Sequence, residues 1–173
     1  MYAFKLDYVD PGQAQGLVKE NYSVFPEGVE PPLPFVLMSA SPGIQAQGAI
    51  RLKYYMSHPN LSPQLMASVR YLCAKVFDYP ACIEFNGGLL GRMGATDADL
   101  KALVEDLDKA PLEENEITML KLVDKFVRAP ETVTAGDVQA CRDAGWTDAD
   151  VMDVCFQAAT MQATGRLMKA FQA

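Results

Sequence analysis

Histidine and basic side chains are scarce in this chain. It has a single histidine, His58, and 15 Lys and Arg stand against 22 Asp and Glu, which gives a formal net charge of −7. Proteins that bind nucleic acid usually present a basic face, so this balance argues against nucleic acid and against an anionic membrane surface as partners. The four cysteines form no C-x-x-C pair, which, with so little histidine, argues against a structural zinc site. We expect neither a metal nor a cofactor.

Long apolar runs are absent as well. No segment approaches the roughly 18 uninterrupted apolar residues of a membrane span. The first seven residues lack the apolar core of a signal peptide. The sequence therefore predicts a cytoplasmic protein whose cysteines are mostly reduced thiols.

The chain does contain enough apolar surface for one ordinary domain. Of its 173 residues, 50% are hydrophobic and 21% are charged, which excludes a disordered chain. A domain of this length buries about 70% of its unfolded surface and needs no disulfide or metal to hold it together. Four prolines between positions 26 and 34 keep a long helix out of the first segment. We therefore expect an N-terminal arm, 1–34, and an all-α domain, 35–173.

Helical periodicity dominates that domain. Apolar residues recur at spacings of three and four in 62–77, where Ser62 and Pro63 mark a helix start. No segment shows the alternation that would indicate a strand. The predicted fold class is all-α, a bundle of about seven or eight helices. The expected helices are 11–22, 42–55, 62–77, a segment from Pro80 to Met93, one after Thr96, 113–128, 134–145 and 148–171.

Several helix boundaries can be predicted from capping residues. Gly94 and Gly145 each end a helix, a threonine two residues later caps the next one, and an acid follows that threonine after three residues. Asp10 before Pro11 predicts a similar start for the first, short helix.

The segment 78–94 contains residues that a bundle core does not require. Asp78 is a candidate N-cap and Pro80 fits the first helical turn. This places Cys82 near a helix N-terminus, where the macrodipole favours a thiolate. Asn86 lies four residues further on, on the same face.

Three glycines follow Asn86 closely. Each costs a helix about 0.8–1 kcal/mol relative to alanine, which suggests that another backbone or a ligand approaches them. The alternative is a turn at Asn86-Gly87 that interrupts the helix. An apolar face at helical spacing favours the continuous helix; it consists of Cys82, Phe85, Leu89 and Met93.

In this frame the chain resembles the AhpD-like, or carboxymuconolactone decarboxylase, family. Members typically carry C-x-x-C-x-x-x-H at the start of a helix that ends in glycine and precedes a capped helix. The resemblance covers roughly residues 8–171. Upstream of the motif, 61–65 resembles the start of the family's preceding helix. Downstream, 161–167 resembles its last helix, where Arg166 is the residue that remains of the family's Asn-Arg pair. The frame here reads Tyr79-Pro80-Ala81-Cys82-Ile83-Glu84-Phe85-Asn86, closed by Gly94 and Thr96.

The chain departs from the family at the residues of its redox chemistry. The family's first cysteine falls on Tyr79, its histidine on Asn86, and its upstream glutamate near Ala67. For intact members the resemblance implies a thiol pair that cycles between dithiol and disulfide, with Glu and His relaying a proton. Here Cys82 is the one remaining thiol of the pair, and Asn86 cannot titrate.

Three functions are compatible with these residues. The sequence does not decide among them, nor whether the chain is an enzyme. The first is an AhpD-like protein of the peroxide and thiol redox type whose relay is largely lost. Such a protein is at most a weak thiol peroxidase with Cys82 as nucleophile and with Tyr79 and Asn86 lining its pocket. The second is a non-catalytic module for a small ligand or for assembly. The third is a non-redox lyase or isomerase that uses Glu84 and Arg166.

Each candidate also has a purely structural interpretation. Cys82 can be a small buried hydrophobe, because cysteine is among the most buried residue types. Asn86 can bond a neighbouring helix, Tyr79 can fill the volume of the missing cysteine, and Arg166 can pair with an acid. The other cysteines lie in apolar helical stripes and are expected to fill the core; they are Cys73, Cys141 and Cys155.

The resemblance also implies partners. Family members are usually homo-oligomers with the motif helix close to a subunit interface, which implies a dimer, trimer or hexamer. If thiol chemistry persists, a thiol reductant or redox partner protein is implied as well.

Overall fold

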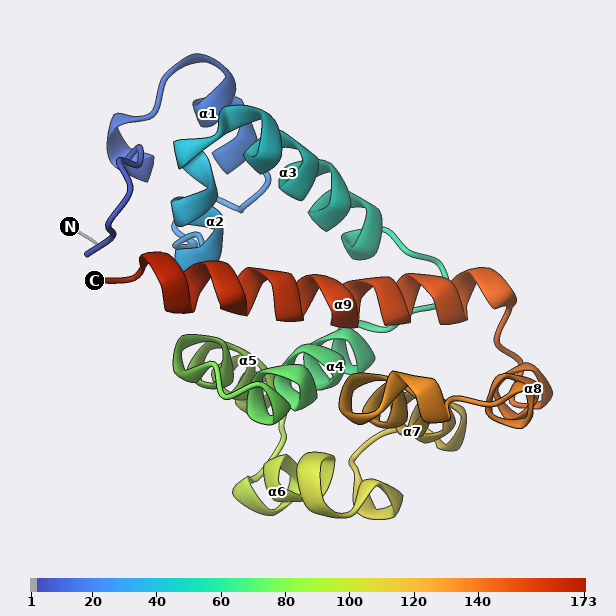
Figure 1. The fold of residues 1–173 in the computed structure, drawn as a ribbon. Coiled ribbons are helices and arrows are strands. Elements are labelled where there is room, and N and C mark those ends of the chain that lie inside the picture. The colour runs from blue at the N-terminus through green and yellow to red at the C-terminus, as the bar shows by residue number, and fades with distance from the viewer. Residues whose placement is uncertain (1–2) are drawn as a thin grey trace. The chain divides into compact units, whose positions relative to one another are not determined.

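The structure is a computed structural model that describes residues 3–173. Within these residues the chain forms nine α-helices and four short 3-10 helices, with one isolated β-bridge and no strand (Figure 1). The all-α prediction is confirmed. No helix of the described part is long and apolar enough to cross a membrane.

The chain divides into two compact units. The first comprises the described residues up to Pro59 together with Thr164–Ala173, and the second comprises Asn60–Ala163. The proposed arm, 1–34, with its boundary at residue 34, stays a prediction. The first unit contains η1 (Pro11–Gln13), α1 (Gly16–Tyr22), α2 (Leu33–Leu37), η2 (Met38–Ala40), α3 (Pro42–Met56) and the end of α9 (Asp148–Phe171).

The helix predicted over 11–22 is divided in two. Asp10 accepts a hydrogen bond from the Gly12 amide at 2.9 Å and caps η1, as expected. The chain is then extended at Ala14 and Gln15 before Gly16, with φ +52°, opens α1. Helix α2 was not predicted. It forms because a proline, which interrupts a long helix, is compatible with the first turn of a short one.

The core of the first unit lies between α1, α2 and α3. The ring of Phe35 meets the rings of Tyr22 and Phe25 edge to face, at centroid distances of 5.9 and 5.0 Å. Beside this core the buried amides of Asn21 and Gln45 bond each other at 3.1 Å. The remaining buried apolar members are Val18, Val24, Val36 and Ala49.

The two ends of the described chain are hydrogen-bonded within the first unit. Phe4 and Gln172 form an antiparallel bridge, and the Ala173 amide donates to the carbonyl of Ala3 at 2.9 Å. The start of the described chain and its C-terminal end accordingly belong to the same unit.

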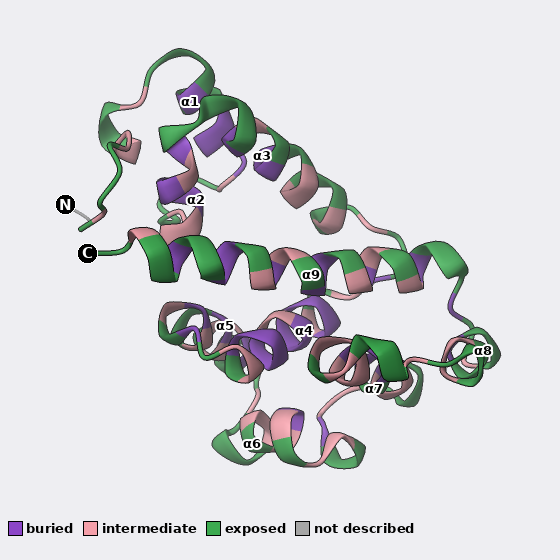
Figure 2. Ribbon diagram, in the orientation of Figure 1, coloured by how far each residue is buried: buried purple, intermediate pink, exposed green. Residues whose placement is uncertain are grey.

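The second unit is organised around α4. This helix is buried over most of its circumference, as the purple ribbon in Figure 2 shows, and it packs against α5, α6 and α7. A helix with so wide an apolar surface needs neighbours on several sides. The helices are α4 (Pro63–Val76), α5 (Pro80–Arg92), α6 (Asp97–Glu105), η3 (Leu107–Lys109), α7 (Glu114–Arg128), η4 (Pro130–Thr132), α8 (Ala135–Asp143) and the first part of α9.

The predicted caps at Ser62, Thr96 and Thr147 are confirmed. Ser62 accepts from the Leu65 amide at 2.9 Å at the start of α4. Thr96 and Asp99 form a reciprocal capping box, and Gly94, with φ +100°, ends the preceding helix. The same arrangement recurs at Gly145, Thr147 and Asp150, before α9.

Candidate functional site

The turn between α4 and α5 sets the position of the motif helix. After α4 the Tyr79 amide donates to the Ala74 carbonyl at 2.9 Å and the Asp78 amide to the Lys75 carbonyl at 3.4 Å. These two bonds form a Schellman motif, which requires a left-handed residue at its centre. Asp78 takes that conformation, with φ +54°. The expectation that Asp78 caps α5 is therefore wrong: it ends α4, and Tyr79 is the N-cap residue of α5.

Cys82 lies in the first turn of α5, as the sequence predicted. Its side chain is buried, with 8% exposure, and all four cysteines are free thiols. Burial raises the pKa of the Cys82 thiol, because the thiolate loses its hydration in the interior. The thiol is therefore predominantly protonated at neutral pH, although it lies near a helix N-terminus.

The helix runs through Asn86, so the alternative of a turn at Asn86-Gly87 is excluded. Asn86 is 2% exposed, and its Nδ2 donates to the Cys82 carbonyl at 2.8 Å. Its Oδ1 accepts from Nε of Arg70, on α4, at 3.0 Å. Asn86 thus joins the backbone of the Cys82 turn to a guanidinium of the neighbouring helix.

Arg70 is a partly buried side chain in the middle of α4. Desolvation lowers the pKa of its guanidinium to about 10, so the group stays charged at neutral pH. Its one hydrogen bond within residues 3–173 is the bond to Asn86, and no acid of that range pairs with it.

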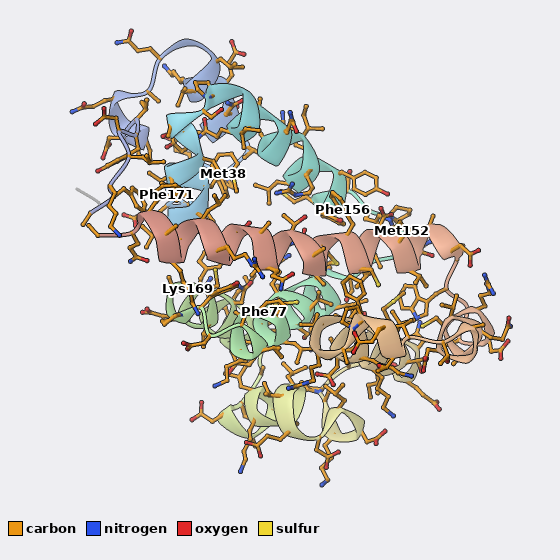
Figure 3. All side chains as sticks on the ribbon, viewed as in Figure 1. Met38, Phe77, Met152, Phe156, Lys169 and Phe171 are labelled. Carbon is orange, nitrogen blue, oxygen red and sulfur yellow. The ribbon has the colours of Figure 1, made fainter. Side chains whose placement is uncertain are left out.

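Tyr79 fills a buried position at the entrance to α5. It is 6% exposed, its hydroxyl donates to the Gln162 carbonyl on α9 at 3.1 Å, and its ring lies 5.8 Å from that of Phe77, labelled in Figure 3. A buried tyrosine normally finds a partner for its hydroxyl while its ring packs. These contacts agree with the space-filling interpretation of Tyr79.

The glycines of α5 differ in their surroundings. A Cβ at Gly87 would stand 3.3 Å from the ring of Tyr71, so a side chain of α4 does approach the helix there. Gly88 and Gly91 are exposed, and a Cβ at Gly91 would meet no atom within 4 Å. The close approach expected at three glycines is therefore found at one of them.

The other predicted site residues are more exposed. Glu84 lies on the exposed side of α5, and Arg166 is exposed on α9, in the first unit. Burial raises the pKa of Cys73 to about 12 and that of Cys155 to about 11, and Cys141 is fully buried. Within the described residues no three potential metal ligands among His, Cys, Asp and Glu lie together.

Arg70 is the residue that the sequence analysis missed. The available signal was Arg70 as the single charged residue between Leu65 and Ala74, a stretch that is apolar apart from Ser68. Periodicity indicates which side of a helix is buried, but it does not show that a long side chain from that helix will bond Asn86 on the next one.

Among the solved structures that share this fold are two peroxidase-related proteins. The first is an uncharacterized peroxidase-related protein with an alkylhydroperoxidase AhpD core, from Ralstonia eutropha JMP134. Its TM-score is 0.79 at 16% identity, over 99% of this chain and 91% of that one. The second is an uncharacterized peroxidase-related protein from Silicibacter sp. TM1040. Its TM-score is 0.80 at 18% identity, over 98% of this chain and 88% of that one.

Comparison of the sequence itself gives no match. No protein-family model matches the chain, and no curated protein matches it. The predicted resemblance is thus confirmed as a likeness of fold: the chain has the AhpD-like helical fold.

Proposed function

We propose that this chain uses an AhpD-like fold to bind a small ligand and that its dithiol redox chemistry has been lost. The observation that carries the proposal is the environment of Cys82. Its thiol is buried, its pKa is raised by desolvation, and Asn86 stands one turn away where the proton relay of the family would need a base. The proposal includes a cytoplasmic location, where thiols stay reduced.

Peroxide reduction makes demands that this environment does not favour. The thiolate attacks one peroxide oxygen, an alcohol leaves, and the resulting sulfenic acid must be reduced by a second thiol. Burial keeps Cys82 protonated, and neither the amide of Asn86 nor the charged guanidinium of Arg70 accepts a proton at neutral pH. The polar groups beside Cys82 are therefore better suited to holding a ligand than to activating a thiol.

A weak single-cysteine peroxidase is the second candidate, because Cys82 is a free thiol in the first turn of a helix. In this case an external thiol, supplied by a reductant or a redox partner protein, would reduce the sulfenic acid.

One pair of measurements separates the two candidates. The native protein is treated with a thiol reagent, and hydroperoxide consumption is then followed with a dithiol reductant for wild type, Cys82→Ser and the control Cys155→Ser. The binding-module proposal predicts no rapidly reacting thiol and the same background rate for all three proteins. A rate that depends on Cys82 and is kept in Cys155→Ser would overturn it in favour of the peroxidase.

A further inference from the structure

Arg70 contributes a cation that the described chain does not neutralise. Its Nε is used by Asn86, and no acid of residues 3–173 pairs with the guanidinium. Buried charges in proteins are normally paired, because an isolated charge loses hydration without compensation. The lowered pKa of Arg70 has this origin, since desolvation is its cause.

The two terminal nitrogens of Arg70 are within reach of solvent. In the described part of the chain, one fully enclosed side-chain polar atom lacks a hydrogen-bond partner, and it is the hydroxyl of Ser68. The two Nη atoms of Arg70 also lack a hydrogen-bond partner in the described residues. Unlike the Ser68 hydroxyl, they are not fully enclosed by protein. Each therefore keeps some solvent-accessible surface, in agreement with the intermediate burial of Arg70 as a residue.

The bond to Asn86 orients the guanidinium. With Nε held at 3.0 Å from Oδ1, the outer edge with both Nη groups is left free. That edge presents parallel N–H donors, which match the two oxygens of a carboxylate.

The helix around Arg70 is apolar. Met66, Ala67 and Ala74 lie one turn away on its own face, and none is more than 3% exposed. One cation in such surroundings compensates one negative charge, and a dianion such as phosphate would keep an uncompensated charge.

We propose that the Arg70 guanidinium, oriented by Asn86, binds a small monocarboxylate through its two terminal nitrogens. This inference rests on the proposed ligand-binding function and specifies the class of the ligand. The family's frame places a glutamate near Ala67, on the same face of α4. This chain has no acid there and a cation one turn further on.

Binding of hexanoate to the intact protein tests the inference. Isothermal titration is carried out with hexanoate and acetate, with the uncharged analogue hexanamide, and with inorganic phosphate. The variants are Arg70→Gln, which keeps an amide donor for Asn86, and Arg70→Lys, which keeps the charge but loses the planar edge. The control is Arg92→Gln, which removes an exposed arginine from the last turn of α5. The thermal midpoint of each variant is measured to verify that it folds.

The expected result is carboxylate binding to wild type and Arg92→Gln, with affinity lower by about tenfold or more in both Arg70 variants. Hexanamide and phosphate should bind more weakly than hexanoate. The inference is overturned if neither carboxylate binds, if hexanamide or phosphate binds as well as hexanoate, or if folded Arg70→Gln retains the affinity. None of these outcomes bears on peroxide consumption, so a Cys82-dependent peroxidase rate identifies a failure of the proposed function separately.

Discussion

At the scale of single residues, Ser68 and Ser39 are a matched pair of buried hydroxyls. Ser68 is fully buried, and its Oγ has no hydrogen-bond partner within residues 3–173. Ser39 is 2% exposed; it donates to the Val36 carbonyl at 2.7 Å and accepts from the Val9 amide at 2.8 Å. An unsatisfied buried hydroxyl costs about 1–3 kcal/mol, whereas a satisfied one contributes about 1 kcal/mol.

Alanine at these two positions should therefore act in opposite directions. We expect Ser68→Ala to raise the free energy of unfolding by about 1 kcal/mol and Ser39→Ala to lower it by about 1–2 kcal/mol, measured by urea denaturation. A loss of stability in Ser68→Ala would show that its hydroxyl is satisfied in solution.

Cys73 makes stability depend on pH. Burial raises its pKa to about 12, whereas a thiol in the unfolded chain has a pKa near 8.5. Between these values the unfolded state releases the proton and the folded state keeps it, so stability is full below pH 8.5 and falls as pH rises.

Cys73→Ala should reduce this pH dependence. Urea denaturation between pH 8 and 10 should show wild type losing stability more steeply than the variant, by about 1.4 kcal/mol per pH unit above 8.5. Equal slopes for the two proteins would mean that Cys73 has an ordinary pKa in the folded state.

The sequence was informative about single residues when the signal was local. The position of Cys82 in the first turn of a helix followed from Pro80 and from apolar spacing, and it is confirmed. The role of Arg70 did not follow, because its bond to Asn86 joins two helices. Such a pairing depends on how helices pack, which no spacing within one helix encodes.

At the scale of secondary-structure elements, Asp78 holds a position that favours glycine. The turn after α4 needs a left-handed residue, and φ of +54° costs an L-residue roughly 1–2 kcal/mol. We expect Asp78→Gly to be more stable than Asp78→Ala by about 1 kcal/mol in chemical denaturation. Both variants remove the carboxylate, so the difference isolates the backbone. Equal stability would mean that the turn relaxes away from the left-handed region.

The glycines of α5 allow a second comparison on one helix. Gly91→Ala should stabilise the protein by about 0.5–1 kcal/mol, because the new Cβ meets open space and alanine favours the helix. Gly87→Ala should gain less or lose stability, because its Cβ would press on the ring of Tyr71 at 3.3 Å. The two variants are compared by thermal denaturation. A higher midpoint for Gly87→Ala than for Gly91→Ala would contradict the prediction.

Helix boundaries were predictable where a capping side chain sets them. Ser62, Thr96 and Thr147 cap as their sequences indicate. The prediction failed at Asp78, since an aspartate before a proline-initiated helix suits an N-cap as well as a left-handed turn. The hydrogen bonds of the preceding helix end decide between the two, and the sequence does not show them.

At the scale of the whole molecule, exposed apolar side chains bear on the expected assembly. On α3, Ile50 and Met56 are 68% and 69% exposed; on α9, Met152 and Phe156 (labelled in Figure 3) are 67% and 56% exposed. Each unit thus exposes large apolar side chains, and association surfaces commonly bury side chains of this kind. They support the proposal of a homo-oligomer without fixing which copy of the chain covers which helix.

Light scattering at micromolar concentration should therefore give a mass above the 18.9 kDa of one chain. If α9 contributes to the subunit contact, Phe156→Glu should give a lower mass than the wild type. The association would then bury an unpaired carboxylate, which is costly. A mass of one chain for the wild type would contradict the proposal.

The all-α fold itself was predictable from the sequence because its signals are periodic and repeated over many helices. The division into two units was not, since the second boundary falls inside the uninterrupted helix α9, where no turn residue marks it.

The backbone pairing of residues 3 and 4 with residues 172 and 173 means that a short linker could join these ends without distorting the first unit. A circular permutant cut in the exposed turn around Gly28 would then keep every helix of the described residues intact.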